Sequence, residues 1–187
     1  MKNILFITLV LIFDSFGVLQ ALPSQVSIIR YVEIANQGNS LSTKGKERAA
    51  ALSPYFMEEK NLTIYGPPVA IYAMSAPKGE ITKYATESVT PLAEKLKLTV
   101  IDTYEKDNYK KMVEEISKNN VYHGKHVLIC WDSSLIPDIT RAFKVLQSPS
   151  KWPKDTYDRV WVLSLSGTDK FSLKNIPQRL LFGDTTK

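Results

Sequence analysis

The sequence has one cysteine and two histidines among 187 residues, and both shortages limit its chemistry. Cys130 has no partner for an intramolecular disulfide, so the hydrophobic core must hold the fold. It lies in the apolar run HVLICW and is expected to be a small buried hydrophobic residue. The spacing of His123 and His126 suits a metal, but two histidines without further ligands are weak evidence. We therefore expect no metal site and no cofactor.

After the first 21 residues, the sequence also lacks any apolar run long enough to cross a bilayer. The first 21 combine basic Lys2, an apolar stretch and the small residue Ala21 at a plausible cleavage point, which is typical of a secretory signal. A membrane anchor is the alternative, but Asp14 interrupts a stretch that is already short for a span. We expect residues 1–21 to be removed on export to the periplasm or the extracellular space. Residues 22–187 then form one domain that does not span a membrane.

A gathered basic surface is missing as well, although the net charge is +5 and the pI is near 9.1. The lysines of KGKER, EKLK and NYKKM are interleaved with acidic residues, as on solvated helix faces. A nucleic-acid surface needs basic residues on one face, preferably with aromatic residues that stack on bases. The sequence predicts no nucleic-acid partner.

What the sequence does have is an alternation of strand-like and helix-like segments. Short runs rich in β-branched and aromatic residues predict strands; these are QVSIIRY, VAIYAMS, TVID, KHVLICW and DRVWVLSL, with the tail NIPQRLLFGD as a further edge strand. Apolar residues at helical spacing predict the helices between them; one starts at Ser42 or Thr43, and the others cover residues 81–96, NYKKMVEEISKN and SLIPDITRAFKVL. The acidic stretch IDTYEKDN is expected to be a solvated turn before a helix. This alternation predicts an α/β fold, a three-layer αβα sandwich with a mostly parallel central sheet.

Three predicted strands end in polar or aromatic residues. These ends are Arg30–Tyr31, Ser75 and Trp131–Asp132. In parallel sheets of this kind, ligands bind beyond the carboxyl ends of the strands. The sequence therefore predicts a site where the three ends meet.

Read in order, these segments resemble the histidine phosphatase superfamily, which has the phosphoglycerate mutase-like fold. The family's Arg-His-Gly-Glu strand end corresponds to RYVE, Arg30–Glu33. LSTKGKERA fits the family's entry to its first helix, and YAMSAPKGEITKYATESVTPLAEKL fits its second strand and loop. VLICWDSSLIP corresponds to a third strand that ends in His-Ser. Each motif alone is weak, and their order and spacing carry the resemblance over nearly all of residues 22–187.

The resemblance implies a vestigial phosphate pocket of four residues. Arg30 keeps the family's first arginine. Tyr31 stands at the position of the histidine nucleophile, Tyr84 at the second arginine of the phosphate clamp, and Asp132 at the second histidine. Further residues of the same strand ends are candidates for the pocket lining, or for packing: Glu33, Ser75 and Trp131.

These substitutions disfavour phosphoryl transfer. A phenol has a reference pKa near 10 and needs a base or cationic surroundings to ionise. Loss of a clamp arginine removes charge-assisted hydrogen bonds worth about 1.5–3 kcal/mol each. A carboxylate at Asp132 would repel a phosphate charge about 4 Å away by about 4 kcal/mol at an effective dielectric near 20. We predict that Asp132 instead pairs with Arg30 and that its charge raises the pKa of Tyr31.

Two functions follow from this pattern. The first is an exported, catalytically inactive relative, a pseudophosphatase with a binding or regulatory role, whose partner is a small molecule or a protein. The second is an enzyme, a phosphomonoester hydrolase of altered mechanism with Tyr31 or Asp132 as its nucleophile, since both residue types carry covalent intermediates elsewhere.

Overall fold

The computed structural model describes residues 22–37, 39–76, 78–79 and 83–185. The predicted signal segment, residues 1–21, lies outside these described residues, as does Ile81 near the start of one predicted helix. No helix in the described part of the chain is both long and apolar enough to cross a membrane.

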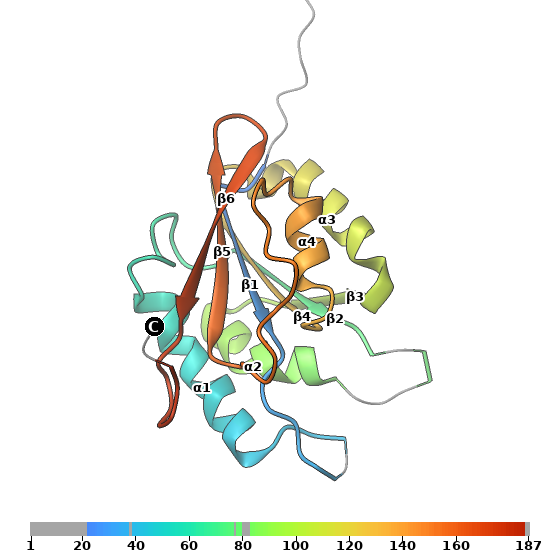
Figure 1. Cartoon of the computed structure of the whole chain (residues 1–187), viewed down its shortest axis with the longest axis vertical. Helices are drawn as coiled ribbons and strands as arrows, with labels where there is room; N and C mark the ends of the chain where they lie inside the picture. The colour runs from blue at the N-terminus through green and yellow to red at the C-terminus, as the bar shows by residue number, and fades with distance from the viewer. Residues whose placement is uncertain (1–21, 38, 77, 80–82, 186–187) are drawn as a thin grey trace, which may run out of the picture.

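A single six-stranded sheet forms the centre of the molecule (Figure 1). Its strands are β1 (Gln25–Arg30), β2 (Ala70–Met74), β3 (Val100–Tyr104), β4 (His126–Trp131), β5 (Arg159–Ser166) and β6 (Lys170–Pro177). The order across the sheet is β3-β2-β4-β1-β5-β6. The first four strands pair in parallel, and β5 and β6 run antiparallel at one side. The predicted mostly parallel sheet is confirmed.

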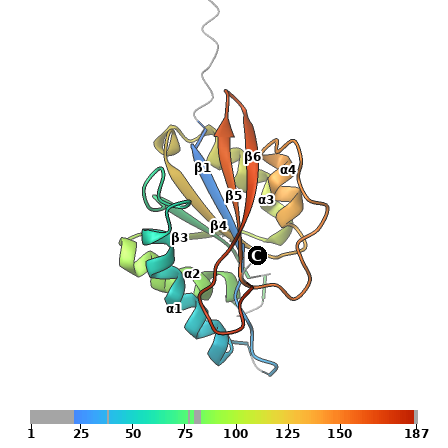
Figure 2. The same ribbon diagram turned by 60° about the vertical axis from the view of Figure 1, so that its left-hand side comes forward.

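Within the described residues, four α-helices cover the two faces of this sheet. They are α1 (Thr43–Glu58), α2 (Tyr84–Leu96), α3 (Tyr109–Lys118) and α4 (Ile136–Ala142). Figures 1 and 2 show α1 and α2 on one face and α3 and α4 on the other. Their apolar residues pack into two separate core clusters, so the three-layer αβα sandwich is confirmed.

Local signals in the sequence explain how these helices begin. Ser42 is the N-cap of α1, where its Oγ accepts a hydrogen bond of 3.0 Å from the Gly45 N–H. Pro137 lies in the first turn of α4, where its missing N–H is tolerated. Helix α2 continues through Pro91, so the strain expected there does not end the helix.

The C-terminal strand differs from the prediction. The tail NIPQRLLFGD was expected to supply an edge strand, but β6 starts earlier, at Lys170, and ends at Pro177. Its early start follows from the tight turn after β5, where Gly167 takes a positive φ of 78° and reverses the chain. Proline then ends the strand because it has no N–H for the ladder.

Gly45 fixes the approach of α1 to the chain that leaves β1. A Cβ atom at this position would lie 2.0 Å from the carbonyl oxygen of Glu33. The same carbonyl accepts hydrogen bonds from the Ser42 N–H at 2.9 Å and from the Ser42 Oγ at 3.2 Å. Glycine is therefore required here for a close backbone contact beside the strand end.

Candidate functional site

The carboxyl ends of β1 and β4 lie side by side. Arg30 is level with Trp131 in the parallel ladder, so Tyr31 and Asp132 each follow as the next residue beyond the paired strands. The Tyr31 N–H still donates to the Trp131 carbonyl, at 3.3 Å. Tyr31 and Asp132, which the resemblance places at two histidine positions, are thus brought together at one edge of the sheet, as predicted.

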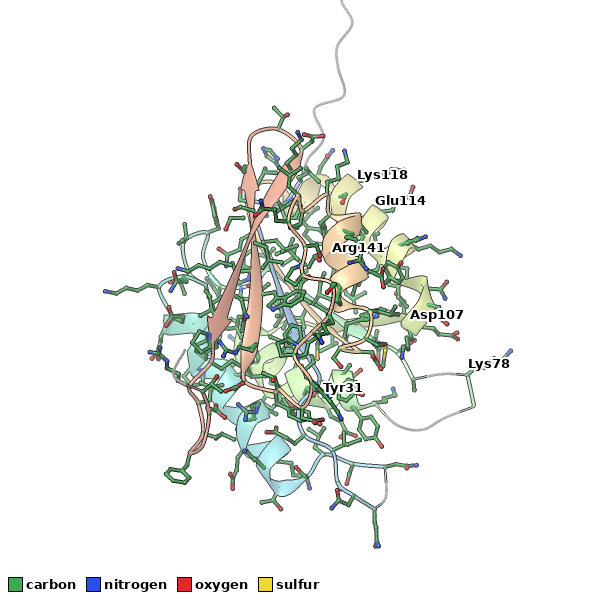
Figure 3. All side chains as sticks on the ribbon, viewed as in Figure 1. Tyr31, Lys78, Asp107, Glu114, Lys118 and Arg141 are labelled. Carbon is green, nitrogen blue, oxygen red and sulfur yellow. The ribbon has the colours of Figure 1, made fainter. Side chains whose placement is uncertain are left out.

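Tyr84 joins this pair from the first turn of α2. Its ring centroid lies 5.9 Å from that of Tyr31, with the ring planes tilted by 37°. Ser88, one turn later, is buried; its Oγ donates to the Tyr84 carbonyl at 2.6 Å and accepts from the Val32 N–H at 3.0 Å. This bridge holds the start of α2 against the chain that leaves β1. Figure 3 shows Tyr31 at the same end of the molecule as this helix.

Asp132 is held by a lysine and a serine. Its Oδ1 accepts from the backbone N–H of Ser134 at 2.8 Å and from the Ser134 Oγ at 2.6 Å. Its Oδ2 lies 3.1 Å from the Nζ of Lys106. Burial alone would raise the pKa of Asp132, but the Ser134 hydrogen bonds and Lys106 outweigh burial and hold that pKa below its usual value. Asp132 is therefore an ionised carboxylate with both oxygens occupied.

The predicted ion pair between Arg30 and Asp132 is wrong. Lys106 takes the carboxylate instead, and the Arg30 guanidinium lies over aromatic rings, 3.9 Å from the centroid of Tyr157 and 5.5 Å from that of Tyr31. Within the described residues, Arg30 has no hydrogen-bonded or ion-paired acceptor.

The alternation of side chains along β1 explains why Arg30 does not pair with Asp132. Val26 and Ile28 of β1 pack in the cluster under α3 and α4, whereas Ile29 packs in the cluster under α1 and α2. Arg30 continues the row of Val26 and Ile28, and Tyr31 packs against the other cluster. Arg30 therefore leaves the sheet on the face that Trp131 shares, toward the loop that carries Tyr157.

Tyr31 is held in its neutral form. Desolvation by burial is the main cause that raises the pKa of Tyr31, and the charge of Asp132 raises it further. Arg30 and Lys106 act in the opposite direction without reversing the shift. The predicted effect of Asp132 on this pKa is confirmed in direction.

The three candidate lining residues have other contacts. Trp131 is fully buried in the core, and its Nε1 donates to the Lys106 carbonyl at 3.2 Å, so it positions Lys106 and does not line a pocket. Glu33 is paired with the buried Arg48, with an Oε1–Nη2 distance of 2.9 Å. Ser75 donates its N–H to the Tyr104 carbonyl at 2.9 Å. The packing interpretation is the correct one for Trp131.

Both histidines of the sequence lie away from the site. His126 starts β4 and is level with Gln25 at the start of β1, so it is at the opposite end of these strands. It is fully buried, and its ring nitrogens contact the Gly66 carbonyl at 3.2 Å and the Ser27 Oγ at 2.8 Å. His123 precedes that strand. In the described ranges, no group of three or more histidine, cysteine or acidic residues could hold a metal ion.

Sequence reasoning missed Lys106, Ser88 and Tyr157. Lys106 lies in the stretch IDTYEKDN, which was expected to be a solvated turn. The first four residues of that stretch belong to β3, and Lys106 begins the 3₁₀ turn η1 (Lys106–Asn108) one residue beyond the strand. The rule that ligand groups follow strand ends would have pointed to Lys106. Tyr157 lies in an irregular loop, and no periodic pattern marks it.

Comparisons with known proteins connect this arrangement to one fold. The protein histidine phosphatase SixA, solved in complex with tungstate, matches with a TM-score of 0.56 and 13% identity over 82% of this chain and 97% of its own. Two further SixA proteins, for which phosphohistidine phosphatase activity is proposed, also match. The one from Agrobacterium tumefaciens has a TM-score of 0.55, 10% identity, and coverage of 83% of this chain and 99% of its own. The one from Nakamurella multipartitia has a TM-score of 0.51, 12% identity, and coverage of 83% and 95%.

By sequence, no family model matches the chain, and no curated protein matches it. At these identities the structural likeness shows the fold, which is the phosphoglycerate mutase-like fold of the SixA proteins. The fold expected from the resemblance is confirmed.

Proposed function

We propose that this protein is an exported, catalytically inactive histidine-phosphatase-like protein that acts by binding a ligand or a protein outside the cytoplasm. The single observation that carries the proposal is the pair of residues at the ends of β1 and β4. A neutral phenol, Tyr31, and a carboxylate already bound by Ser134 and Lys106, Asp132, stand where the resemblance places two imidazoles.

Phosphoryl transfer at neutral pH needs an available electron pair on the nucleophile. Tyr31 stays a protonated phenol, which is a weak nucleophile, because burial and Asp132 both raise its pKa. A general base near the phenol would change this, but both histidines lie elsewhere in the fold. Tyr84 also replaces a guanidinium that would bind the transferred group.

Asp132 is the other nucleophile that the enzyme alternative requires. Its Oδ1 already accepts two hydrogen bonds from Ser134, and its Oδ2 is paired with Lys106. An attack on phosphorus would have to break these contacts. Its lowered pKa also makes it a poor general acid at neutral pH. These contacts favour the binding function over the hydrolase.

The test is hydrolysis of a generic aryl phosphate by the purified protein, by Tyr31→Phe and by Asp132→Asn. Tyr65→Phe is the matched control, because Tyr65 is a partly exposed tyrosine with none of the site contacts. We expect all four proteins to be indistinguishable from a buffer blank. Turnover by the unmodified protein that is lost in Tyr31→Phe or Asp132→Asn and kept in Tyr65→Phe would establish the hydrolase instead.

Export is the second part of the proposal. It is supported by residues 1–21, which combine the basic residue Lys2, an apolar stretch and the small residue Ala21. When the full chain is expressed in a bacterium, we expect the protein outside the cytoplasm, and its measured mass should equal that of residues 22–187. A product that keeps its first 21 residues in the cytoplasm would exclude export and leave the proposed binding role in place.

A further inference from the structure

A cavity opens beside Arg30. It has a volume of about 310 Å³ and lies between the end of β4 and the loop that leads into β5. Figure 1 shows that loop, in orange, running from α4 down to the lower end of the sheet. The charged and hydroxyl residues that line it include Arg30, Ser133, Ser150, Lys151, Lys154 and Asp155. We call it the loop cavity; Tyr31, Tyr84 and Asp132 do not line it.

The loop cavity contains a cation without a counter-ion. In the part of the chain that the structure describes, Arg30 has no acceptor for its N–H groups, and its Nε is enclosed by protein. The Arg30 guanidinium lies over the Tyr157 ring, with its Cζ 3.9 Å from the ring centroid. This contact fixes the plane of the guanidinium and leaves N–H groups at its edge for an acceptor. A guanidinium edge of this kind matches the paired oxygens of an oxyanion.

The loop that completes the cavity is anchored in the core. Trp152 is buried against Trp161, with ring centroids 4.9 Å apart, and its Nε1 donates to the Thr156 carbonyl at 2.9 Å. This anchor places Lys151 and Lys154 at the cavity, and among the described residues neither side chain forms an ion pair. The lysines are exposed, but the backbone that carries them is held in place.

Both the net positive charge of the loop cavity and its hydrogen-bond donors favour an anionic ligand. Arg30, Lys151 and Lys154 supply three positive charges against one carboxylate, Asp155. Ser133 and Ser150 add hydroxyl groups that have no protein partner among the described residues. Hydroxyl groups and guanidinium N–H groups are the donors that tetrahedral oxyanions accept.

We propose that the loop cavity binds the oxyanion of a phosphate or sulfate monoester, with Arg30, Lys151 and Lys154 as its cations and Ser133 and Ser150 as hydroxyl donors. The site is displaced from the position that the resemblance gives to phosphate. It deepens the proposed binding function and rests on it.

The experiment titrates the purified protein with inorganic phosphate, sulfate and acetate at low ionic strength, by calorimetry or by backbone amide NMR. The variants are Lys151→Ala, Lys154→Ala, Arg30→Gln and Asp132→Asn, and thermal unfolding checks that each remains folded. Lys118→Ala is the matched control, because Figure 3 shows Lys118 at the end of the molecule opposite Tyr31.

We expect phosphate or sulfate to bind, and acetate to bind more weakly. Each lysine variant should lose about two- to fivefold in affinity, as expected for an exposed charge. Arg30→Gln should lose roughly tenfold or more, as expected for a charge-assisted hydrogen bond. Lys118→Ala should leave affinity unchanged. If phosphate binds more tightly than sulfate, the ligand of the loop cavity is a phosphate monoester. If sulfate binds more tightly, the ligand is a sulfate ester.

Three results would overturn the proposal. One is no binding of phosphate or sulfate at millimolar concentration. Another is acetate binding as tightly as both. The third is binding that survives both lysine variants and tightens in Asp132→Asn, which would place the anion beside Tyr31 instead. All three leave the proposed function standing, because only hydrolysis of the aryl phosphate by the same preparations contradicts it.

Discussion

His126 should make the protein lose stability in mild acid. Its side chain is fully buried at the start of β4, with Nδ1 near the Gly66 carbonyl and Nε2 near the Ser27 Oγ. The Phe56 ring lies 6.3 Å away. Burial disfavours the imidazolium and lowers the pKa of His126 from 6.5 to about 4 in the folded protein, although the Gly66 contact acts in the opposite direction.

The sign follows from proton uptake. Below pH 6.5 the unfolded chain binds a proton on this imidazole, and the folded protein does not, so the free energy of unfolding falls as the pH falls. The loss ends near pH 4, where the folded protein binds the proton too. A shift from 6.5 to about 4 corresponds to about 3 kcal/mol, since each pKa unit is worth about 1.4 kcal/mol.

Urea unfolding between pH 7.5 and pH 4 measures this effect. We compare the unmodified protein with His126→Gln, whose amide can replace both contacts but does not titrate, and with His123→Gln, which removes the exposed histidine. The difference in unfolding free energy between the unmodified protein and His126→Gln should change by about 3 kcal/mol over this range. Parallel curves for these two proteins would refute the argument, as would a slope removed by His123→Gln.

The remaining predictions concern the backbone and the charges near the site. Gly45→Ala should destabilise the protein by about 1–3 kcal/mol, or prevent folding, because the added Cβ would lie 2.0 Å from the Glu33 carbonyl oxygen; thermal unfolding measures it, and an unchanged midpoint would contradict the close approach. Lys106→Met should raise the pKa of both Asp132 and Tyr31, because Lys106 lowers both. Carboxyl NMR and ultraviolet titration of tyrosine measure these shifts, and unchanged values would show that Lys106 does not control the site charge.

The sequence was sufficient to predict which strand ends meet. Alternating elements imply a parallel sheet, and parallel strands place their carboxyl ends at one edge, so Tyr31 and Asp132 were expected together. The register of β1 and β4 confirms this. The place of Tyr84 came from the resemblance, and the ring contact with Tyr31 agrees with it.

The electrostatic partners could not be predicted in the same way. The strand order β3-β2-β4-β1-β5-β6 brings the end of β3 near that of β4, and nothing in the sequence states this order. Lys106 reaches Asp132 across that edge. The face that Arg30 takes was readable in principle, because Val26 and Ile28 precede it on the same row. The loop that brings Tyr157 under Arg30 has no periodicity from which to predict it.

The pairing of Asp132 with Lys106 means that catalysis and anion affinity depend on different residues, whereas the sequence predicted one cause for both. Had Arg30 neutralised Asp132, loss of catalysis and loss of anion affinity would have had one cause. Instead, Lys106 offsets the carboxylate, and Arg30 keeps an uncompensated positive charge beside the loop cavity. Phosphoryl transfer needs an activated nucleophile, whereas anion binding needs only a positioned cation and hydrogen-bond donors. On the proposed function, a fold of this kind loses phosphoryl transfer and still binds an anionic ligand, and the two properties should respond to different substitutions.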